Sequence, residues 1–389
     1  MRPAFRFPPR ACRGFTVMEI VVAMGIFIVL GAALITILRQ GLALWRTGEA
    51  KKNAHEKANF ILSYLREDLA NTYSKVGGSM PIRFLCDLEP ESEERGAQRQ
   101  RLRFVRTRRG ESQHPIGSQG GRVLESNQYF DHFGDVEEAR SGYLRAGAGL
   151  QEVLYSLDPD PDSTTLWRGV RSPPGGAGSL MAPGWDSSWV EESCRELASG
   201  ILHLEFRFWT QYTSTWEEED FPYPFPHDEE RRSGPAFIWD STRGLFPPED
   251  DMPDDAFRMY RGPDSMEDSS DDIFPRQVLV ILVMETPIQV TLSSGISAET
   301  SRIPIRGAAK LPGDGPGYVR IDREWIRYVK VEKGRLVLES SFRGRGARWT
   351  MAASHKKGTD VRVGRTFRMT VRIAASRDHW DEGVLNRGH

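Results

Sequence analysis

The sequence has few cysteines and almost no excess of charge of one sign. Its 389 residues include three cysteines (Cys12, Cys86 and Cys194) and 52 basic against 54 acidic side chains. Three widely spaced cysteines exclude a disulfide scaffold and do not supply the closely spaced ligands of a thiolate zinc site. The near balance of charge provides no global field that would attract nucleic acid. We therefore expect no metal and no nucleic-acid partner.

Motifs of catalysis and cofactor binding are also missing. The chain contains no Gly-rich phosphate loop, H-E-x-x-H helix, nucleophile elbow or dinucleotide fingerprint. Ser354 and Lys357 form an S-x-x-K string, but the companion motifs of a penicillin-recognising enzyme do not accompany it. A triad assembled in space would leave no such motif. We expect a protein that is not an enzyme, with no catalytic residue and no cofactor.

The sequence does contain one long apolar run near its amino terminus. Residues 15–38 carry a single charged side chain, Glu19. As a helix this run would measure roughly 36 Å, which exceeds the ~30 Å hydrocarbon core of a bilayer. Four arginines and no acidic residue precede it, which favours a cytoplasmic amino terminus. Basic residues also follow the run, so charge alone gives only a modest preference for this orientation.

The junction before the apolar run supplies a second argument. It reads Gly14-Phe15-Thr16-Val17-Met18-Glu19, and it resembles the GFTxxE signal of prepilins in the type IV pilin superfamily. The resemblance implies that a prepilin peptidase cuts between Gly14 and Phe15 and that the new amino terminus at Phe15 is methylated. An ordinary secretory signal is cut after its apolar stretch, and a lipoprotein cysteine would follow an apolar segment, whereas PPRA precedes Cys12.

Glu19 is an ionisable residue inside the predicted membrane span, where charged groups are unfavourable. An ionisable group inside a span costs several kcal/mol unless it is paired. The resemblance implies that its carboxylate meets the amino-terminal nitrogen of a neighbouring subunit, so that correct stacking offsets the cost of burial. The alternative is a glutamate that reaches the nearby membrane surface without any role in assembly.

Beyond the span, a helical apolar stripe continues. Its residues fall at i, i+3, i+4, i+7 and i+11, and they are Ala58, Ile61, Leu62, Leu65 and Leu69. The spacing predicts a helix to about Tyr73, which Gly77-Gly78 would end. We expect an α+β, pilin-like fold in which this long helix packs on an antiparallel β-sheet that carries large loop and β insertions. The leader would be residues 1–14, the membrane half of the helix 15–38 and its periplasmic half 39–75.

Strand patterns dominate the rest of the chain. Residues 152–157 and 165–170 flank the turn-forming DPDPDS and predict a hairpin. Residues 201–209 alternate apolar and polar side chains, which predicts a strand with one buried face. The apolar run 278–284 fits a strand buried on both faces, and residues 367–373 alternate and would join it in one sheet.

The predicted domains follow from these patterns. A globular β domain would comprise residues 76–300 and 361–376, an inserted β module would comprise 301–360, and 377–389 would form a flexible tail. Acidic residues crowd 249–272, but no spacing resembles the twelve-residue calcium loop. A solvated loop is favoured there over a calcium site.

The inserted module resembles a small β module of phage tail and other extracellular proteins. The shared pattern is I-x-x-E-x-I-x-Y, then RG, then A-x-H-x-x-G. The resemblance implies framework roles for six residues, which are Glu324, Tyr328, Arg343, Gly344, His355 and Gly358. A metal or catalytic role for His355 is the alternative, and a structural role in a β-turn is favoured.

A second resemblance concerns the arrangement from residue 201. The segments LHLEFRFW, Trp216, IWDS at 238–241 and FPRQVLVILV are similar to those of the J-type minor pseudopilin of type II secretion systems. This implies a non-catalytic subunit at the tip of a periplasmic pseudopilus, which helps to initiate the filament. The chain is longer than the usual J-type subunit, and the comparably long K-type subunit typically lacks the acid that matches Glu19.

The resemblance also implies partners and location. The partners would be the prepilin peptidase, the I- and K-type minor pseudopilins, the major pseudopilin and the bacterial inner membrane. The chain would cross that membrane once, with a periplasmic carboxyl-terminal domain, where a disulfide between Cys86 and Cys194 is permitted. Two alternatives stay open: a minor pilin of a type IV pilus and a periplasmic enzyme with a pilin-like anchor.

Overall fold

The protein's structure, a computed structural model, falls into two units, residues 1–53 and 54–389. Several stretches lie outside the described residues, including the leader with Gly14 and Phe15, the acidic 249–272 segment apart from residues 258–259, and the tail. The structure describes residues 16–74, 83–88, 98–108, 114–115, 143–144, 149–172, 174–175, 179–181, 187–209, 236–241, 245–246, 258–259, 273–311, 314–340 and 344–374.

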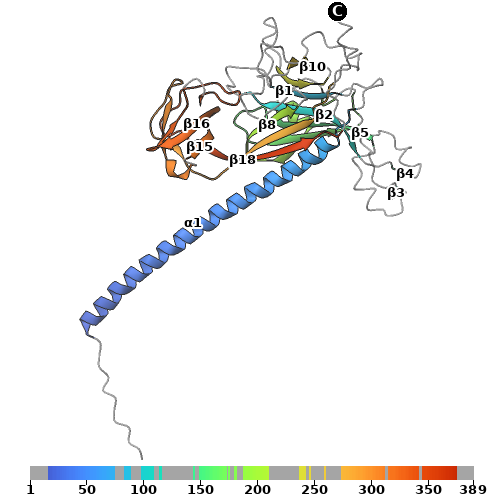
Figure 1. Ribbon diagram of the computed structural model, residues 1–389. Helices are drawn as coiled ribbons and strands as arrows, with labels where there is room; N and C mark the ends of the chain where they lie inside the picture. Colours follow the sequence, from blue (N-terminus) through green and yellow to red (C-terminus); the bar gives the residue numbers. More distant parts are fainter. Residues whose placement is uncertain are drawn as a thin grey trace, which may run out of the picture. The chain divides into compact units, whose positions relative to one another are not determined.

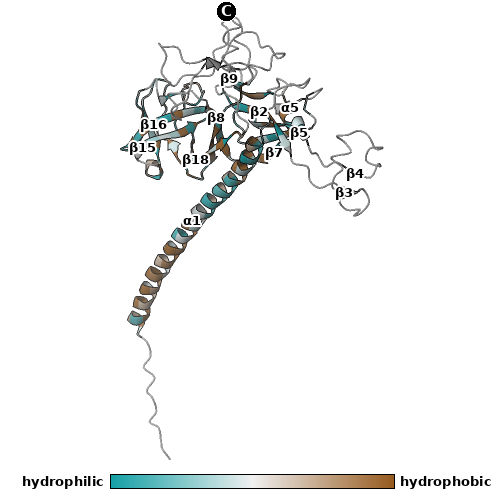
Figure 2. Cartoon of the chain, turned by 45° about the vertical axis from the view of Figure 1, so that its right-hand side comes forward, coloured by the Kyte–Doolittle hydropathy of each residue, from teal (hydrophilic) through white to brown (hydrophobic). Residues whose placement is uncertain are grey.

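The described part of the first unit is helical and belongs to α1 (Val17–Ala70), which continues into the second unit. No proline interrupts these 54 residues, and proline is the residue that helix interiors tolerate least. Figure 2 shows brown, hydrophobic colour over the first part of α1 and more teal over its last part. The segment Val17–Leu42 is long and apolar enough to cross a membrane, because 26 helical residues measure about 39 Å.

The second unit contains the end of α1, the short helices α5 and η3, and the described strands (Figure 1). The helices are α5 (Ser187–Ser193) and η3 (Ala308–Lys310). The strands are β1 (Phe84–Leu88), β2 (Gln100–Arg108), β3 (His114–Pro115), β4 (Tyr143–Leu144), β5 (Gly149–Leu157), β6 (Leu166–Arg171), β7 (Arg195–Ala198), β8 (Ile201–Trp209), β9 (Ala236–Asp240), β10 (Leu245–Phe246), β11 (Arg258–Met259), β12 (Gln277–Glu285), β13 (Thr291–Leu292), β14 (Arg302–Arg306), β15 (Asp314–Ile321), β16 (Glu324–Glu332), β17 (Arg335–Val337) and β18 (Val361–Arg372).

Most of these strands form two sheets. Within the described residues, one sheet has the order β7-β6-β5-β2-β1-β9 and the other the order β13-β14-β17-β16-β15-β18-β12-β8. Neighbouring strands pair antiparallel throughout both sheets. The fold class is therefore α+β, as the sequence predicts.

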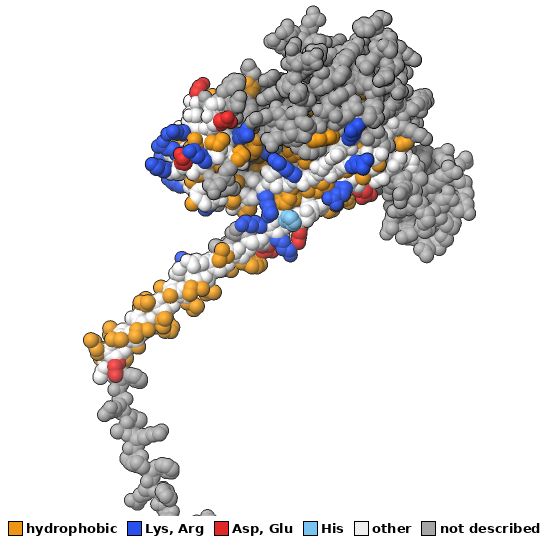
Figure 3. Space-filling view, viewed as in Figure 1, with side chains coloured by type: hydrophobic (Ala, Val, Ile, Leu, Met, Phe, Trp, Pro, Cys, Tyr) orange, Lys and Arg blue, Asp and Glu red, His pale blue; other side chains and the backbone are white. Residues whose placement is uncertain are grey.

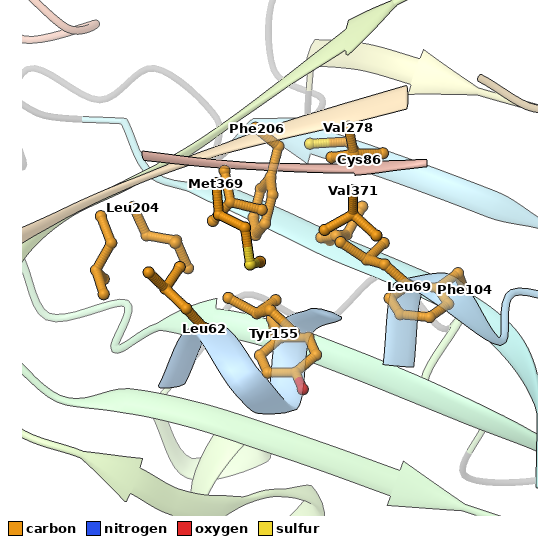
Figure 4. Close-up of a cluster of buried hydrophobic side chains, with 14 of the residues drawn as sticks. Leu62, Leu69, Cys86, Phe104, Tyr155, Leu204, Phe206, Val278, Met369 and Val371 are labelled. Atoms are coloured by element: carbon orange, nitrogen blue, oxygen red, sulfur yellow. The ribbon is translucent and has the colours of Figure 1, made fainter. Parts of the chain in front are cut away.

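The main apolar cluster joins α1 to both sheets. The predicted stripe of α1, from Ala58 to Leu69, is buried in it together with Phe104 and Tyr155 of the first sheet. Figure 4 shows Leu62 and Leu69 of the helix among these side chains and those of Leu204, Phe206, Met369 and Val371. The helical spacing of the stripe thus places one face of α1 against the core, and this prediction is confirmed.

The inserted module has an apolar cluster of its own, which contains Val319, Ile326 and Leu336. The cluster begins at Val290, ahead of the expected boundary at residue 301, and ends at Val363. Strand β18 serves both clusters, because Val361 and Val363 face the module and Met369 and Val371 face the main core. The module therefore extends the second sheet through this shared strand.

Several strand predictions are confirmed and one is wrong. β5 and β6 form the expected hairpin, and β12 pairs with β18 as predicted, with both faces buried. We expected the polar face of β8 to meet solvent, yet His203, Glu205 and Arg207 on that face are also buried. The module covers this face, since the His203 ring lies 5.7 Å from that of Trp325 and 6.2 Å from that of Trp349.

Candidate functional site

The first turn of α1 satisfies its own polar groups through Thr16 and Glu19. The Thr16 backbone N–H donates to Glu19 Oε2 at 2.8 Å, and the Thr16 hydroxyl donates to the same oxygen at 3.0 Å. In return, the Glu19 N–H donates to Thr16 Oγ1 at 3.2 Å. This reciprocal arrangement is a capping box. The Glu19 carboxylate is thereby fixed at the helix end, beside the position where the predicted cleavage would create a free amine.

The predicted cleavage site itself, Gly14 and Phe15, lies outside the described residues. Cleavage and methylation there therefore remain predictions. Glu19 is the one acidic side chain of the span Val17–Leu42, and within the described first unit it lies in the first turn of α1.

The apolar side chains of the span are exposed over its whole length. Val17, Phe27 and Leu42 have 79%, 77% and 54% of their surface accessible, and orange side chains follow this part of the helix in Figure 3. An added Cβ at Gly25 or Gly31 would meet no atom of this chain within 4 Å. Exposed apolar surface of this extent is typical of segments that contact lipid or other protein chains.

At its other end, α1 is attached to the first sheet through Asp68. Asp68 is 1% exposed and accepts hydrogen bonds from the Tyr155 hydroxyl at 2.5 Å, from Arg168 Nε at 2.9 Å and from Arg106. Burial raises the pKa of Tyr155, and the neighbouring Asp68 carboxylate raises it further. Asp68 follows Ile61 by seven residues and Leu65 by three, so the periodicity that predicted the stripe also indicates a buried acid, which the sequence analysis did not identify.

A second buried network lies in the inserted module, around Glu324. Its carboxylate accepts hydrogen bonds from Arg345 Nε at 2.6 Å and Nη2 at 2.7 Å, and from the backbone N–H groups of Gly346 and Ala353. His355 Nε2 lies 2.8 Å from Glu324 Oε2, and its Nδ1 lies 2.7 Å from Asp322 Oδ2. The network closes the loop between β17 and β18 against the start of β16.

The charges in this network stabilise one another. Burial opposes the ionised Glu324, but hydrogen bonds from Arg345, His355 and Ala353 outweigh it and keep the pKa of this carboxyl below its usual value. Burial also opposes protonated His355, but its hydrogen bonds to Glu324 and Asp322 prevail and raise the pKa of the imidazole. His355 therefore joins the carboxylates of Asp322 and Glu324, and its structural role stays a prediction.

The structure describes five of the six predicted framework residues, and at Gly344 an added Cβ would lie 2.8 Å from the Arg327 carbonyl oxygen. The network uses Arg345 and Gly346 as its Arg-Gly pair, whereas we expected Arg343 and Gly344, of which Arg343 lies outside the described residues. Gly346 has φ of 64°, and a Cβ there would lie 2.7 Å from the Thr350 carbonyl oxygen. The repeat RGRG contains both pairs, so the sequence alone does not separate them. Gly358 forms a turn with φ of 87°, and Tyr328 is buried in the module's core.

The two cysteines of the second unit are free thiols in this structure. Cys86 lies in the main cluster and Cys194 in a separate one with Leu154, Leu180 and Val190. Burial raises the pKa of both thiols, that of Cys194 to about 12. The permitted disulfide is therefore not formed here, and each cysteine acts as a small apolar residue.

Within the part of the chain that the structure describes, no group of histidine, cysteine, aspartate or glutamate side chains could hold a metal ion. Comparison with known proteins adds no identification: no family model matches the chain, no curated protein matches its sequence, and no solved structure matches its fold. The features that bear on function are therefore the exposed apolar span of α1 and the attachment of its last part to the second unit.

Proposed function

We propose that this chain is a minor pseudopilin, a non-catalytic subunit of the initiating tip of a type II secretion pseudopilus. The observation that carries the proposal is the composition of α1. Its first part exposes continuous apolar surface with one carboxylate in the first turn, and one face of its last part is buried in an α+β unit. A helix of this kind can anchor in a bilayer and then pack among equivalent helices.

The role of Glu19 follows from the energetics of a charge in a membrane. A carboxylate in a span costs several kcal/mol unless it is paired, and the Thr16 contacts satisfy only part of its acceptor capacity. Cleavage after Gly14 would give a neighbouring subunit a positively charged amine at Phe15. Pairing of that amine with Glu19 would neutralise both charges, so correct stacking would be favoured over any other register.

The proposed setting is the inner membrane of a bacterium, with the second unit in the periplasm. Its partners would be the prepilin peptidase, the I- and K-type minor pseudopilins and the major pseudopilin. The small side chains at Ala23, Gly25, Gly31, Ala32 and Ala33 would allow these helices to approach closely. A minor pilin of a type IV pilus would use the same helix with different neighbours.

Recovery of assembled subunits tests this proposal. The full chain would be tagged at its carboxyl terminus and isolated from membranes of its own host as wild type, Glu19→Ala and the control Glu49→Ala, whose side chain is exposed further along α1. We expect equal membrane levels, and loss of co-purifying pseudopilins by at least ten-fold in Glu19→Ala alone. Undiminished recovery of pseudopilins with Glu19→Ala would contradict the proposed role of the carboxylate. Recovery of type IV pilus subunits in place of pseudopilins would favour that alternative.

A further inference from the structure

A small pocket with both polar and apolar lining lies in the second unit, where the module meets β2 and β8. Four arginines line it, Arg99 beside β2 and Arg320, Arg323 and Arg348 from the module. None of the described lining residues carries a carboxylate. The lining itself therefore carries positive charge, although the whole chain is nearly neutral.

Two of these arginines are buried and have carbonyl groups as their partners. Arg99 donates to the carbonyl oxygens of Asp158, Pro161 and Ser163, and Arg320 donates to those of Pro161 and Asp322. Burial lowers the pKa of each guanidinium to about 10, and the positive charge of Arg99 lowers that of Arg320 further. Carbonyl groups hold these side chains in place, while the carboxylates of Asp158, Asp160, Asp162 and Glu285 favour their charged forms from outside the pocket lining.

The other two arginines border the same space. Arg323 pairs with Asp162 at 2.7 Å, but both side chains are substantially exposed, with 39% and 61% of their surface accessible. Arg348 stacks over the rings of Tyr318 and Trp325, with its Cζ 4.1 and 4.6 Å from the two ring centroids. Stacking of this kind fixes the plane of a guanidinium. The carboxylates that act on the lining residues, which are those of Asp158, Asp160, Asp162, Glu205, Glu285 and Asp322, lie outside the lining itself.

Gln100 adds an independent observation that points to an acceptor. Its side chain is 2% exposed and lines the pocket. The Phe206 N–H donates to Gln100 Oε1 at 2.6 Å, which fixes the orientation of the amide. Gln100 Nε2 has no hydrogen-bond partner within the described residues. A buried donor of this kind costs about 1–3 kcal/mol when it is left unsatisfied, so a ligand that supplies an acceptor here would remove that cost.

We propose that this pocket binds a carboxylate group, which accepts hydrogen bonds from Gln100 Nε2 and from the surrounding guanidinium groups. Planar carboxylates match the paired N–H donors of arginine, and such charge-assisted bonds are the stronger class. Such a carboxylate could belong to an acidic side chain, a chain terminus or a small free acid. The inference uses residues of the second unit only and does not depend on the proposed function.

Thermal unfolding of the purified full chain in detergent tests this site with defined probes. The probes are sodium acetate and the capped peptide N-acetyl-Gly-Asp-Gly-amide, and their controls are sodium chloride at equal ionic strength and the peptide with Asn in place of Asp. A ligand that binds only the folded state raises the unfolding midpoint with its concentration. We expect acetate, the acidic peptide or both to raise the midpoint by roughly 2–4 °C at saturation, beyond the effect of the matched control.

Three variants connect such a shift to the pocket. Gln100→Glu retains an oxygen for the Phe206 N–H and places a carboxylate where Nε2 lies, so it should unfold at or above the wild-type midpoint and lose the response to probes. Arg323→Gln should weaken the response several-fold. Arg335→Gln removes an exposed charge elsewhere in the module and should respond as wild type.

Each result has a defined meaning. A response to both probes supports a site for carboxylates in general, and a response to the peptide alone supports recognition of an acidic polypeptide. Equal responses of the wild type and Gln100→Glu would overturn the proposal, and so would the absence of any specific response, since the pocket would then hold only water. A Gln100→Glu chain that unfolds well below the wild type would also overturn it, because a pocket lined by arginines should accept the added carboxylate.

Discussion

Asp68, near the end of α1, accepts a hydrogen bond of 2.5 Å from the hydroxyl of Tyr155 on β5. Arg168 on β6 and Arg106 on β2 donate to the same carboxylate. One buried acid on the helix is thus bound by three neighbouring strands of the first sheet. In the proposed filament subunit, this contact would connect the amino-terminal helix to the sheet.

Replacement of Asp68 should therefore weaken the second unit. Asp68→Asn leaves two guanidinium groups beside a neutral amide, and the loss of one partner of a buried ion pair typically costs about 3 kcal/mol or more. Tyr155→Phe removes one hydrogen bond and should cost about 1–2 kcal/mol. Denaturant unfolding of the full chain in detergent measures both changes.

The matched control for this test is Glu67→Gln. Glu67 precedes Asp68 but its side chain is exposed, and exposed charges contribute at most about 1 kcal/mol. Equal stability of Asp68→Asn and Glu67→Gln would show that the Asp68 network does not attach the helix to the sheet.

The module should lose stability as the solution becomes alkaline. The pKa of His355 is raised above its ordinary value of 6.5, so its contribution is complete below pH 6.5 and is lost as the pH rises through the folded-state value. The pKa of Glu324 is lowered, so its contribution is present above pH 4.5 and is lost only in stronger acid. Denaturant unfolding at pH 6 and pH 8 should show a larger decrease for the wild type than for His355→Gln. Identical decreases in stability for the wild type and His355→Gln would be inconsistent with the network. The control is His55→Gln, at an exposed histidine of α1, which should show the same decrease as the wild type.

The shared strand β18 should tolerate no side chain at Gly364. A Cβ there would lie 2.2 Å from Val283 Cγ1 on β12 and 3.2 Å from the Met284 carbonyl oxygen. Gly364→Ala forces β18 away from its neighbour and should cost about 1–3 kcal/mol. Gly48→Ala, where an added Cβ meets nothing, should be neutral or stabilising by up to ~1 kcal/mol because it favours the helix. A neutral Gly364→Ala would mean that β12 and β18 are less closely packed than the structure has them.

Thiol labelling tests the state of Cys86 and Cys194. Both are buried and both have raised pKa values, so neither should react with a maleimide in the folded chain. Both should react after unfolding without reductant, because they are free. Mass spectrometry counts the labels, and unfolded chains that acquire none until a reductant is added would instead establish the disulfide that the sequence permits.

The sequence predicts much of the fold because regular elements carry periodic patterns. The stripe from Ala58 to Leu69 and the continuous run from Val278 to Met284 each indicate their own burial. The polar face of β8 carries no such signal, because the burial of His203, Glu205 and Arg207 arises from a module more than 100 residues away. Long-range packing of this kind has no local pattern.

The candidate sites also divide into those with a local sequence pattern and those formed by long-range packing. Glu19 is conspicuous as an acid inside an apolar run, and the spacing of Asp68 already indicates a buried position. The pocket around Gln100 combines side chains from distant segments. The hydrogen bond from the Phe206 N–H to Gln100 Oε1 orients the side-chain amide and leaves its Nε2 without a partner among the described residues. Sequence reasoning could not locate it.

The intact mass of the membrane-extracted chain tests the pilin assignment most directly. The chain would be isolated from cells with and without the prepilin peptidase and measured by mass spectrometry. The account predicts the loss of residues 1–14 and the gain of one methyl group at Phe15 only where the peptidase is present. An uncut chain in both strains would contradict it and would leave an anchored periplasmic protein in place of a filament subunit.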